Sequence, residues 1–274
     1  MAHRLFEDKE HAASYWKYRV SPSPQLIEEI VSFLKKRRDV QPCDLAVDVG
    51  CGSGQGTRLL APHFSTVVGT DVSPAQLGVA LKHAADTNVS YRQCPAEELP
   101  FADSSVDLVT AMCAFHWFDR PRFLQEAHRI LKPKGCLALL SYTADMELHY
   151  RDCYHALNAI CKEFYAALLP YRDPYLGPCS FSLYRQTYLS ITYTDKEWQE
   201  CKRMKKSMPL SSYMGMMESF SSYQTLLKKD PEEARRLSTD ITSRLLAVMG
   251  VTSPETEVVV GVRYFYLLAC KQAD

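Results

Sequence analysis

The chain has 274 residues, of which 46% are hydrophobic, so it is long enough to bury a large core. Its 32 basic and 32 acidic residues cancel, which argues against a nucleic-acid partner. The charged start, MAHRLFEDKEH, is unlike a secretory signal, and no apolar run reaches the roughly 20 residues that cross a membrane. We therefore expect a soluble, cytoplasmic protein without integral membrane association.

The ten cysteines are scattered along the chain and never fall at C-x-x-C spacing. We expect them to be reduced, and most of them, for example Cys113 and Cys136, to be small core residues. The eight histidines show no paired spacing, so we predict no metal site.

The first predicted element is a helix over residues 26–38, where apolar residues recur every three or four positions and basic residues gather at the end. Strand-like and helix-like segments then alternate. Strands are predicted over 45–50, 66–72, 89–94, 106–114 and 135–142, and helices directly after the glycines that follow residue 50, over 74–84 and over 122–132. This alternation predicts an α/β core with a parallel sheet and helices on both faces.

The pattern changes beyond Asp145. A helix is predicted over 148–169, a strand over 183–195, two or three helices over 196–249, and a closing strand pair or one long strand over 256–271. No linker or repeat interrupts the chain, so we expect a single domain over residues 1–274. A separate lid subdomain would leave the same pattern.

Within that single domain we distinguish four parts. They are an N-terminal lid and helix over 1–40, an α/β core over 41–145, a mostly helical insertion over 146–255 and the closing strand over 256–274.

An acidic residue and alternate glycines, Asp48-x-Gly50-x-Gly52-x-Gly54, follow the first predicted strand. In an open parallel sheet, ligands bind outside the carboxyl ends of the strands, so this loop is well placed. Its spacing differs from the G-x-G-x-x-G of dinucleotide loops, and no Gly-Lys-Ser/Thr follows as in a P-loop. An acid inside the loop disfavours a pyrophosphate and suits a ligand with an amino group.

Asp71 ends the second predicted strand, where a carboxylate can bind both hydroxyls of a ribose. Together with the acidic glycine loop, this position predicts a nucleoside that carries positive charge. S-adenosylmethionine fits, because it combines adenine, a free ribose diol, an amino-acid tail and a sulfonium. Two structural alternatives stay open: the glycines can serve turn geometry alone, and Asp71 can cap a helix that starts near Pro74.

Residues 44–142 resemble the class I S-adenosylmethionine-dependent methyltransferases, specifically the small-molecule group that includes the trans-aconitate methyltransferases. Five segments resemble the family's motifs in order: VDVGCGSGQGT, GTDVSP, the two motifs within CPAEELPFADSSVDLVTAM, and EAHRILKPKGCLAL. The resemblance implies a Rossmann-like, seven-stranded, mostly parallel sheet with helices on both faces. It also implies an antiparallel last strand and insertions that vary with substrate.

The resemblance also implies roles for single residues at the cofactor. Gly50, Gly52 and Gly54 are expected to wrap the methionine moiety, and Asp48 to orient it. Asp71 is expected to bind the ribose.

Adenine recognition departs from the family pattern. Val72 is expected to flank the adenine, but Pro95 stands where many relatives have an aspartate that takes the adenine amino group. The Ala96 carbonyl or the Glu97 side chain is the expected substitute. Glu97 can equally be a solvated loop charge.

On the reacting side, the segment AMCAFHWFD follows the fourth predicted strand. His116 can act as a general base, Trp117 and Phe118 can form an aromatic wall near the sulfonium, or all three can serve packing alone. The N-terminal segment resembles the family's Tyr-x-x-Tyr-Arg-Pro lead-in, with Val20 in place of the proline. This resemblance implies a lid made of Tyr15, Tyr18 and Arg19, with Arg19 meeting a carboxylate.

The insertion contains a second group of candidate residues, which can line an apolar acceptor pocket or form helical core. These are Tyr213, Met214, Met216, Met217 and Phe220.

The sequence therefore predicts methyl transfer from S-adenosylmethionine to a small-molecule acceptor, with a carboxylate oxygen as the preferred nucleophile. Two alternatives remain. One is methylation of a hydroxyl, amine or thiol of a lipid or xenobiotic, with His116 as base, and the other is a non-catalytic binding module. The oligomeric state is left open.

Overall fold

The computed structural model describes residues 7–37, 43–176 and 180–272. Its centre is a sheet of eight strands: β1 (Leu45–Val49), β2 (Thr66–Asp71), β3 (Val89–Gln93), β4 (Val106–Met112), β5 (Leu131–Tyr142), β6 (Glu147–His149), β7 (Asp195–Pro209) and β8 (Glu257–Cys270). The first five strands are parallel, in the spatial order β3-β2-β1-β4-β5. The mixed α/β class and the mostly parallel sheet are confirmed.

The long strand β8 explains why the sheet has eight strands and not the seven predicted. β5 pairs antiparallel with residues 264–270 of β8, and the three-residue strand β6 continues along the same edge at residues 259–261. β7 pairs along the opposite edge of β8. The extra strand is therefore a short continuation of the β5 edge.

Two predictions beyond residue 180 were wrong. The segment predicted as a strand, 183–195, lies mostly in helix α7 (Ser180–Ser190), and residues 195–209, predicted as helical, form β7. The aromatic residues of α7 and its Thr187 favour a strand locally, but its inner face packs against β8 in the core. β7 is rich in Lys and Glu because it is an edge strand, whose outer positions face solvent.

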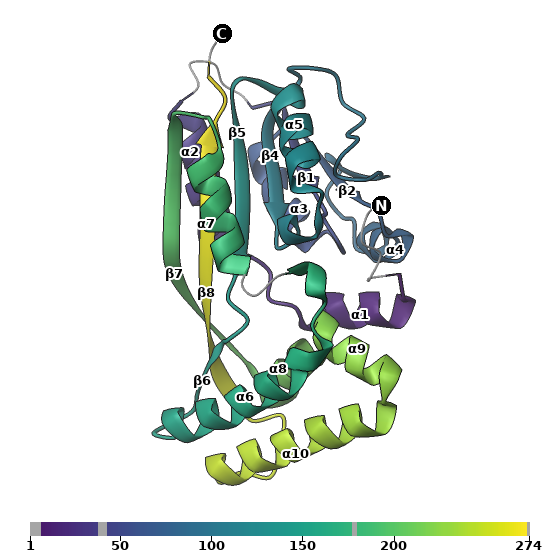
Figure 1. Cartoon of the computed structure of the whole chain (residues 1–274), viewed down its shortest axis with the longest axis vertical. Coiled ribbons are helices and arrows are strands. Elements are labelled where there is room, and N and C mark those ends of the chain that lie inside the picture. Colours follow the sequence, from purple (N-terminus) through teal and green to yellow (C-terminus); the bar gives the residue numbers. More distant parts are fainter. Residues whose placement is uncertain (1–6, 38–42, 177–179, 273–274) are drawn as a thin grey trace.

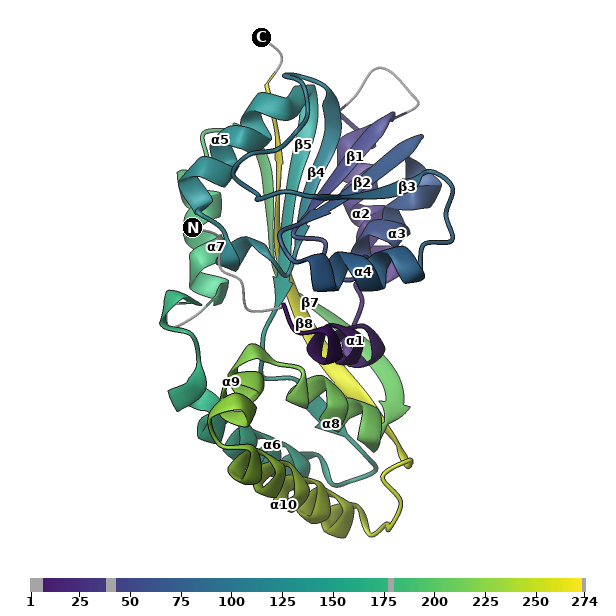
Figure 2. The same ribbon diagram turned by 90° about the vertical axis from the view of Figure 1, so that its right-hand side faces the viewer.

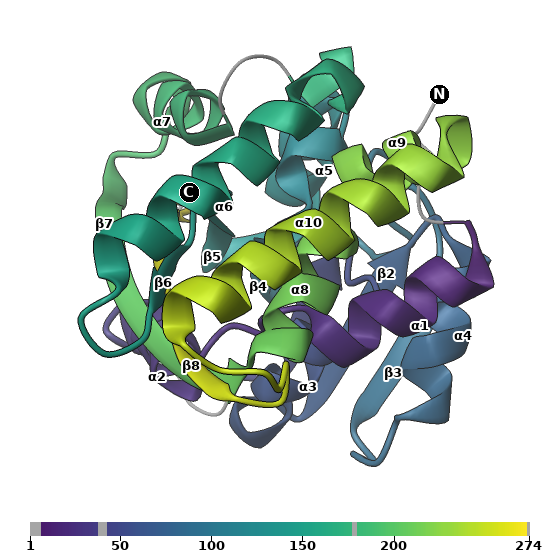
Figure 3. The ribbon, with the colours of Figure 1, turned by 90° about the horizontal axis from the view of Figure 1, so that it is seen from below.

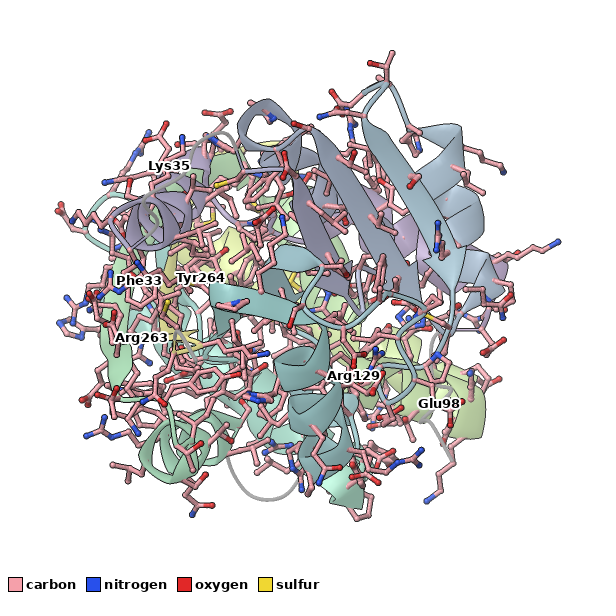
Figure 4. All side chains as sticks on the ribbon, turned by 90° about the horizontal axis from the view of Figure 1, so that it is seen from above. Phe33, Lys35, Glu98, Arg129, Arg263 and Tyr264 are labelled. Carbon is pink, nitrogen blue, oxygen red and sulfur yellow. The ribbon has the colours of Figure 1, made fainter. Side chains whose placement is uncertain are left out.

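Helices cover both faces of the sheet. One face carries α2 (Pro24–Lys35), α3 (Gln55–Leu60) and α4 (Pro74–Lys82), and the other carries α5 (Arg120–Ile130) and α7 (Figure 2). Successive strand residues alternate between two apolar clusters, as Ala46 and Val47 do. Figure 4 labels Phe33 of α2 and Arg129 of α5, which lie on opposite sides of the sheet.

A helical layer lies beyond the carboxyl ends of the parallel strands (Figures 1 and 3). It contains α6 (Tyr154–Leu168), α8 (Leu210–Glu218), α9 (Ser221–Lys229) and α10 (Pro231–Met249). The N-terminal helix α1 (Lys9–Tyr18) lies between this layer and the sheet. The arrangement leaves a cleft at the sheet edge that ends in the glycine loop.

Several side chains hold α1 in place. The Trp16 ring stacks on His83 of α4 at 4.2 Å between ring centroids, and Gln55 Nε2 donates to the Trp16 carbonyl at 2.6 Å. On the other side, the Tyr18 ring packs so closely on Gly215 of α8 that a Cβ there would lie 2.8 Å from it. α1 is thus fixed to both the sheet half and the helical layer.

Among the described residues, no helix is long and apolar enough to cross a membrane. The described cysteines are free thiols. Within the same ranges, no three His, Cys, Asp or Glu side chains come together as a metal-binding group.

Candidate active site

The glycine loop follows β1 and turns back with left-handed backbone. Gly50 has φ 67° and Gly54 has φ 81°, conformations that residues with a Cβ rarely adopt. A Cβ on Gly50 would also lie 2.5 Å from the Ala114 Cβ. Gly54 instead packs against the Tyr91 ring and lines none of the three pockets at this end of the sheet.

Asp71, at the end of β2, fastens this loop. One carboxylate oxygen accepts from the Gly52 amide at 2.8 Å and the other accepts from the Ser73 amide at 2.8 Å. Burial raises the pKa of Asp71, although these amide donors oppose the shift. The N-cap of α4 is Ser73, whose Oγ accepts from the Gln76 amide, so the residue that caps the helix is not Asp71.

Asp48 is 1% exposed and accepts from two threonine hydroxyls, Thr57 at 2.7 Å and Thr110 at 2.8 Å. Burial raises the pKa of Asp48 to about 6, against the effect of the two hydroxyl donors. Asp48 lines a small pocket of about 40 Å³ together with Arg19 and Gln55.

A pocket of about 110 Å³ opens above the glycine loop, and we call it the cofactor pocket. Eight of the predicted site residues line it: Tyr15, Gly50, Gly52, Asp71, Val72, Ala96, Glu97 and Trp117. Bare backbone at the glycines, a buried carboxylate and two aromatic rings suit S-adenosylmethionine. Asp48, Gly54, Tyr18, Arg19 and His116 do not line it.

Glu97 is more than a solvated loop charge. Its Oε1 accepts from the Asp119 amide at 2.7 Å, directly before α5. This bond ties the loop that begins at Pro95 to the start of α5. The Ala96 backbone is therefore held at the wall of the cofactor pocket.

Phe118, predicted with Trp117 as an aromatic wall, also lines the cofactor pocket. Sequence reasoning missed five further residues that line it, namely Cys51, Gln76, Cys94, Met112 and Ala114. It also misplaced Cys113, which was predicted to be core. Cys113 follows β4 with φ 60° and lines the cofactor pocket. Such strained backbone in a residue with a Cβ gathers at functional sites, but a lone cysteine in a sequence gives no sign of it.

A second cavity, of about 390 Å³, adjoins the first, and we call it the acceptor cavity. The two share Tyr15, Cys113 and Trp117 as a common wall. The rest of the acceptor cavity combines polar and charged side chains with an apolar set, and the polar and charged ones include Arg19, His116, Tyr142, Asp145 and Arg172. That apolar set is Leu168, Leu169, Leu176, Phe181, Phe220 and Phe265.

Arg19 places its guanidinium between two aromatic rings, 4.6 Å from the Tyr15 centroid and 4.5 Å from the Phe220 centroid. It donates to the Tyr142 hydroxyl at 2.6 Å and to the Ser219 carbonyl at 3.3 Å. Its Nε is buried without a hydrogen-bond partner.

His116 lies at the wall of the acceptor cavity, with Nδ1 3.4 Å from the Tyr184 hydroxyl. Burial first, and then the charges of Arg19, Arg172 and Arg120, lower the pKa of His116 to about 3. The imidazole is therefore neutral near pH 7.

Of the five candidate residues in the insertion, only Phe220 lines the acceptor cavity. The other four are buried in the core of the helical layer: Tyr213, Met214, Met216 and Met217. The helical-core alternative describes these four correctly.

Comparison with known proteins identifies the family. Residues 47–139 match the family described as a methyltransferase domain. A Dictyostelium discoideum protein described as a methyltransferase is 31% identical over 231 residues, covering 81% of this chain and 80% of that protein. The Saccharomyces cerevisiae protein CRG1, described as an S-adenosylmethionine-dependent methyltransferase, is 32% identical over 156 residues, covering 55% of this chain and 51% of the yeast protein.

Solved structures agree at the level of the fold. A type II methyltransferase from Anaeromyxobacter dehalogenans has a TM-score of 0.73 at 23% identity, covering 94% of this chain and 100% of the other. The Haemonchus contortus phosphoethanolamine N-methyltransferase 2, in complex with S-adenosyl-L-methionine, has a TM-score of 0.51 at 19% identity, covering 97% of this chain and 58% of the other. The chain belongs to the S-adenosylmethionine-dependent methyltransferases, and S-adenosylmethionine is its cofactor.

Proposed function

We propose that the protein transfers the methyl group to a carboxylate oxygen of a small acid. The observation that carries this proposal is the Arg19 guanidinium, which lines the acceptor cavity with a buried Nε that has no partner. A guanidinium with an unused donor at the wall of a cavity favours an anionic ligand.

The electrostatics of the cavity support the same acceptor. Arg19, Arg172 and Arg120 all lower the pKa of His116, so the potential at this wall is positive. A positive, partly desolvated wall favours an anion over an amine, which is a cation near neutral pH. Asp145, which also lines the cavity, is paired with Arg263.

The chemistry needs no strong base. A carboxylate is already ionised near pH 7, and S-adenosylmethionine, when bound, supplies an electrophilic methyl group. Arg19 orients the acceptor, and His116, with a pKa of about 3, serves as a neutral polar contact. Tyr15 and Trp117 form the shared wall and exclude water, so alignment in a closed site supplies most of the rate.

The acid has an apolar body in this proposal, because leucine and phenylalanine side chains line the cavity away from Arg19. Placement in the trans-aconitate-methyltransferase-like group is part of the proposal. It is supported by the His-Trp pair and by the Tyr-x-x-Tyr-Arg segment, with Val20 as the departure. The partner is a small molecule and not a nucleic acid.

We further propose that the whole chain works as one methyltransferase domain in which α1 is a lid. Tyr15 lines both cavities, and Arg19, directly after α1, lines the acceptor cavity. Tyr18 anchors the lid on α8.

The test is product analysis with a panel of small acids that ranges from aliphatic and aromatic monocarboxylates to tricarboxylates. Incubation with S-adenosylmethionine should give methyl esters, which mild base hydrolyses and which mass spectrometry detects. Arg19→Met should raise KM for the best acid by about 10- to 100-fold, because a buried charge-assisted bond is lost. Its affinity for S-adenosylhomocysteine should stay within about twofold.

Arg122→Met is the matched control, since the Arg122 side chain is 57% exposed and lines neither cavity. It should leave KM unchanged. A base-stable methylated product, or an unchanged KM in Arg19→Met, would contradict the proposal.

A further inference from the structure

A buried amide oxygen in the cofactor pocket has no hydrogen-bond partner. It belongs to Gln76, which lies in the first turn of α4 and is 2% exposed. The backbone amide of Gln76 is satisfied by Ser73 Oγ at 3.2 Å, but its side-chain Oε1 is unpartnered. Leaving a buried acceptor unpaired is destabilising, and Gln76 lines the pocket wall, so a donor on the ligand is the expected partner of its Oε1.

The surroundings of Gln76 show which part of the ligand can reach it. A Cβ built on Gly52 would lie 3.8 Å from Gln76 Oε1, so the amide stands directly beside the glycine loop. The Gly52 amide in turn donates to Asp71 at 2.8 Å. The Gln76 amide and the Asp71 carboxylate therefore flank the same loop residue.

The donors of the cofactor are its ribose hydroxyls, the adenine amino group and the charged amino group of the methionine tail. A cationic amino group prefers a carboxylate to a neutral amide. The adenine amino group is expected at Ala96 and Glu97, which follow β3, whereas Gln76 stands beside Asp71. The ribose hydroxyls are the donors that remain for this position.

We propose that Gln76 is a positioning residue for the cofactor ribose: its amide oxygen accepts a hydrogen bond from one ribose hydroxyl, while the Asp71 carboxylate accepts from the other. The inference rests on the assignment of this pocket to S-adenosylmethionine and is independent of which acceptor is methylated. In this proposal the unpaired Oε1 of Gln76 is a ligand of the cofactor, which explains why a polar side chain is buried at this position.

The test is calorimetric titration of the whole protein with S-adenosylhomocysteine and with its 2′-deoxy and 3′-deoxy analogues. Wild type should bind one of the two analogues about 3- to 10-fold more weakly because of the lost Gln76 bond. Gln76→Met keeps the length and removes the acceptor. This variant should bind S-adenosylhomocysteine about 3- to 10-fold more weakly than wild type does. Its affinities for S-adenosylhomocysteine and for that deoxy analogue should differ less than the two affinities of wild type do.

Thermal unfolding without ligand gives a second readout. Because Gln76→Met removes an unsatisfied buried acceptor, its Tm should equal or exceed that of wild type while its affinity falls. A merely structural glutamine would give the reverse pattern. Gln125→Met, an exposed glutamine on α5, should change neither quantity.

Gln76→Leu repeats the test should the methionine variant fold poorly, with the same expectations. Unchanged affinity in a folded variant, or full retention of the wild-type discrimination against both analogues, would overturn the inference. Failure of wild type to bind S-adenosylhomocysteine at all would instead contradict the cofactor assignment. A methylated product that is not a carboxylate ester would contradict the proposed acceptor. It would leave the proposed role of Gln76 intact.

Discussion

Two regions lie on opposite sides of the site: the sheet half, residues 44–142, and the helical layer of α6, α8, α9 and α10. They differ in how far apart in the sequence their contacting residues lie. In the sheet half, a strand, a glycine turn and an acidic residue lie close together in sequence and also in space, as Asp71 and Gly52 do. In the helical layer and its neighbours, partners come from distant segments. Arg19, for example, contacts Tyr142 and Ser219. The residues at the cofactor pocket therefore lie closer together in the sequence than the residues that line the acceptor cavity.

The largest expected effect tests whether the two halves are energetically separate. Phe164 on α6 is 1% exposed and packs on Tyr223, so Phe164→Ala should reduce the free energy of unfolding by about 3–5 kcal/mol. Because β8 pairs with strands in both halves, we expect hydrogen-exchange protection to fall in β1 as well as in α6. Leu189→Ala, at a 65% exposed position, is the control. Loss of protection in α6 alone would show that the layer unfolds by itself.

A second variant tests the glycine loop directly. Gly50→Ala should weaken binding of S-adenosylhomocysteine by about 100-fold or more, because the residue has φ 67° and its new Cβ would meet Ala114. Titration calorimetry measures the change. Gly78→Ala is the matched control, since nothing lies within 4 Å of its Cβ position in α4. It should stabilise the fold by about 0.5–1 kcal/mol and leave affinity unchanged, and equal effects of the two substitutions would refute the argument.

A third measurement follows the buried acid of the loop. The pKa of Asp48 is raised from 3.8 to about 6, so the folded state binds more protons than the unfolded state between these pH values. The stability that this group contributes is complete below about pH 4 and is lost as pH rises through about 6. Relative to Asp48→Asn, wild type should therefore lose about 3 kcal/mol between pH 4 and pH 7, measured by urea unfolding. Parallel pH curves for the two proteins would show that Asp48 is not desolvated in the folded state.

The smallest expected effect is at His116. With a pKa of about 3 the imidazole stays neutral, so kcat with an acid acceptor should not fall as pH is lowered from 8 to about 5. His116→Gln should lower kcat by less than about threefold, since no proton has to move. A decrease of 10²-fold or more would restore the general-base hypothesis and an acceptor that must lose a proton.

The alternation of strands and helices up to Tyr142 was predictable because it rests on apolar runs and glycine turns within short stretches. The exchange of helix and strand around residue 195 was not, because a Lys-rich edge strand and an aromatic helix both contradict local preference. The site divides in the same way. Gly50, Gly52 and Asp71 were predicted from a motif and line the pocket, whereas nothing in the sequence distinguishes Gln76 from a solvated glutamine.

The path of β8 limits how this protein can be shortened. A fragment that ends after Tyr142 would keep every glycine-loop residue but would lose both β7 and β8. The outer edge of β5 would then present unpaired amides and carbonyls beside the apolar side chains of Leu137 and Leu139. Such an edge recruits strands from other molecules. A minimal cofactor-binding fragment should therefore aggregate, unless the closing strand is grafted directly after β5.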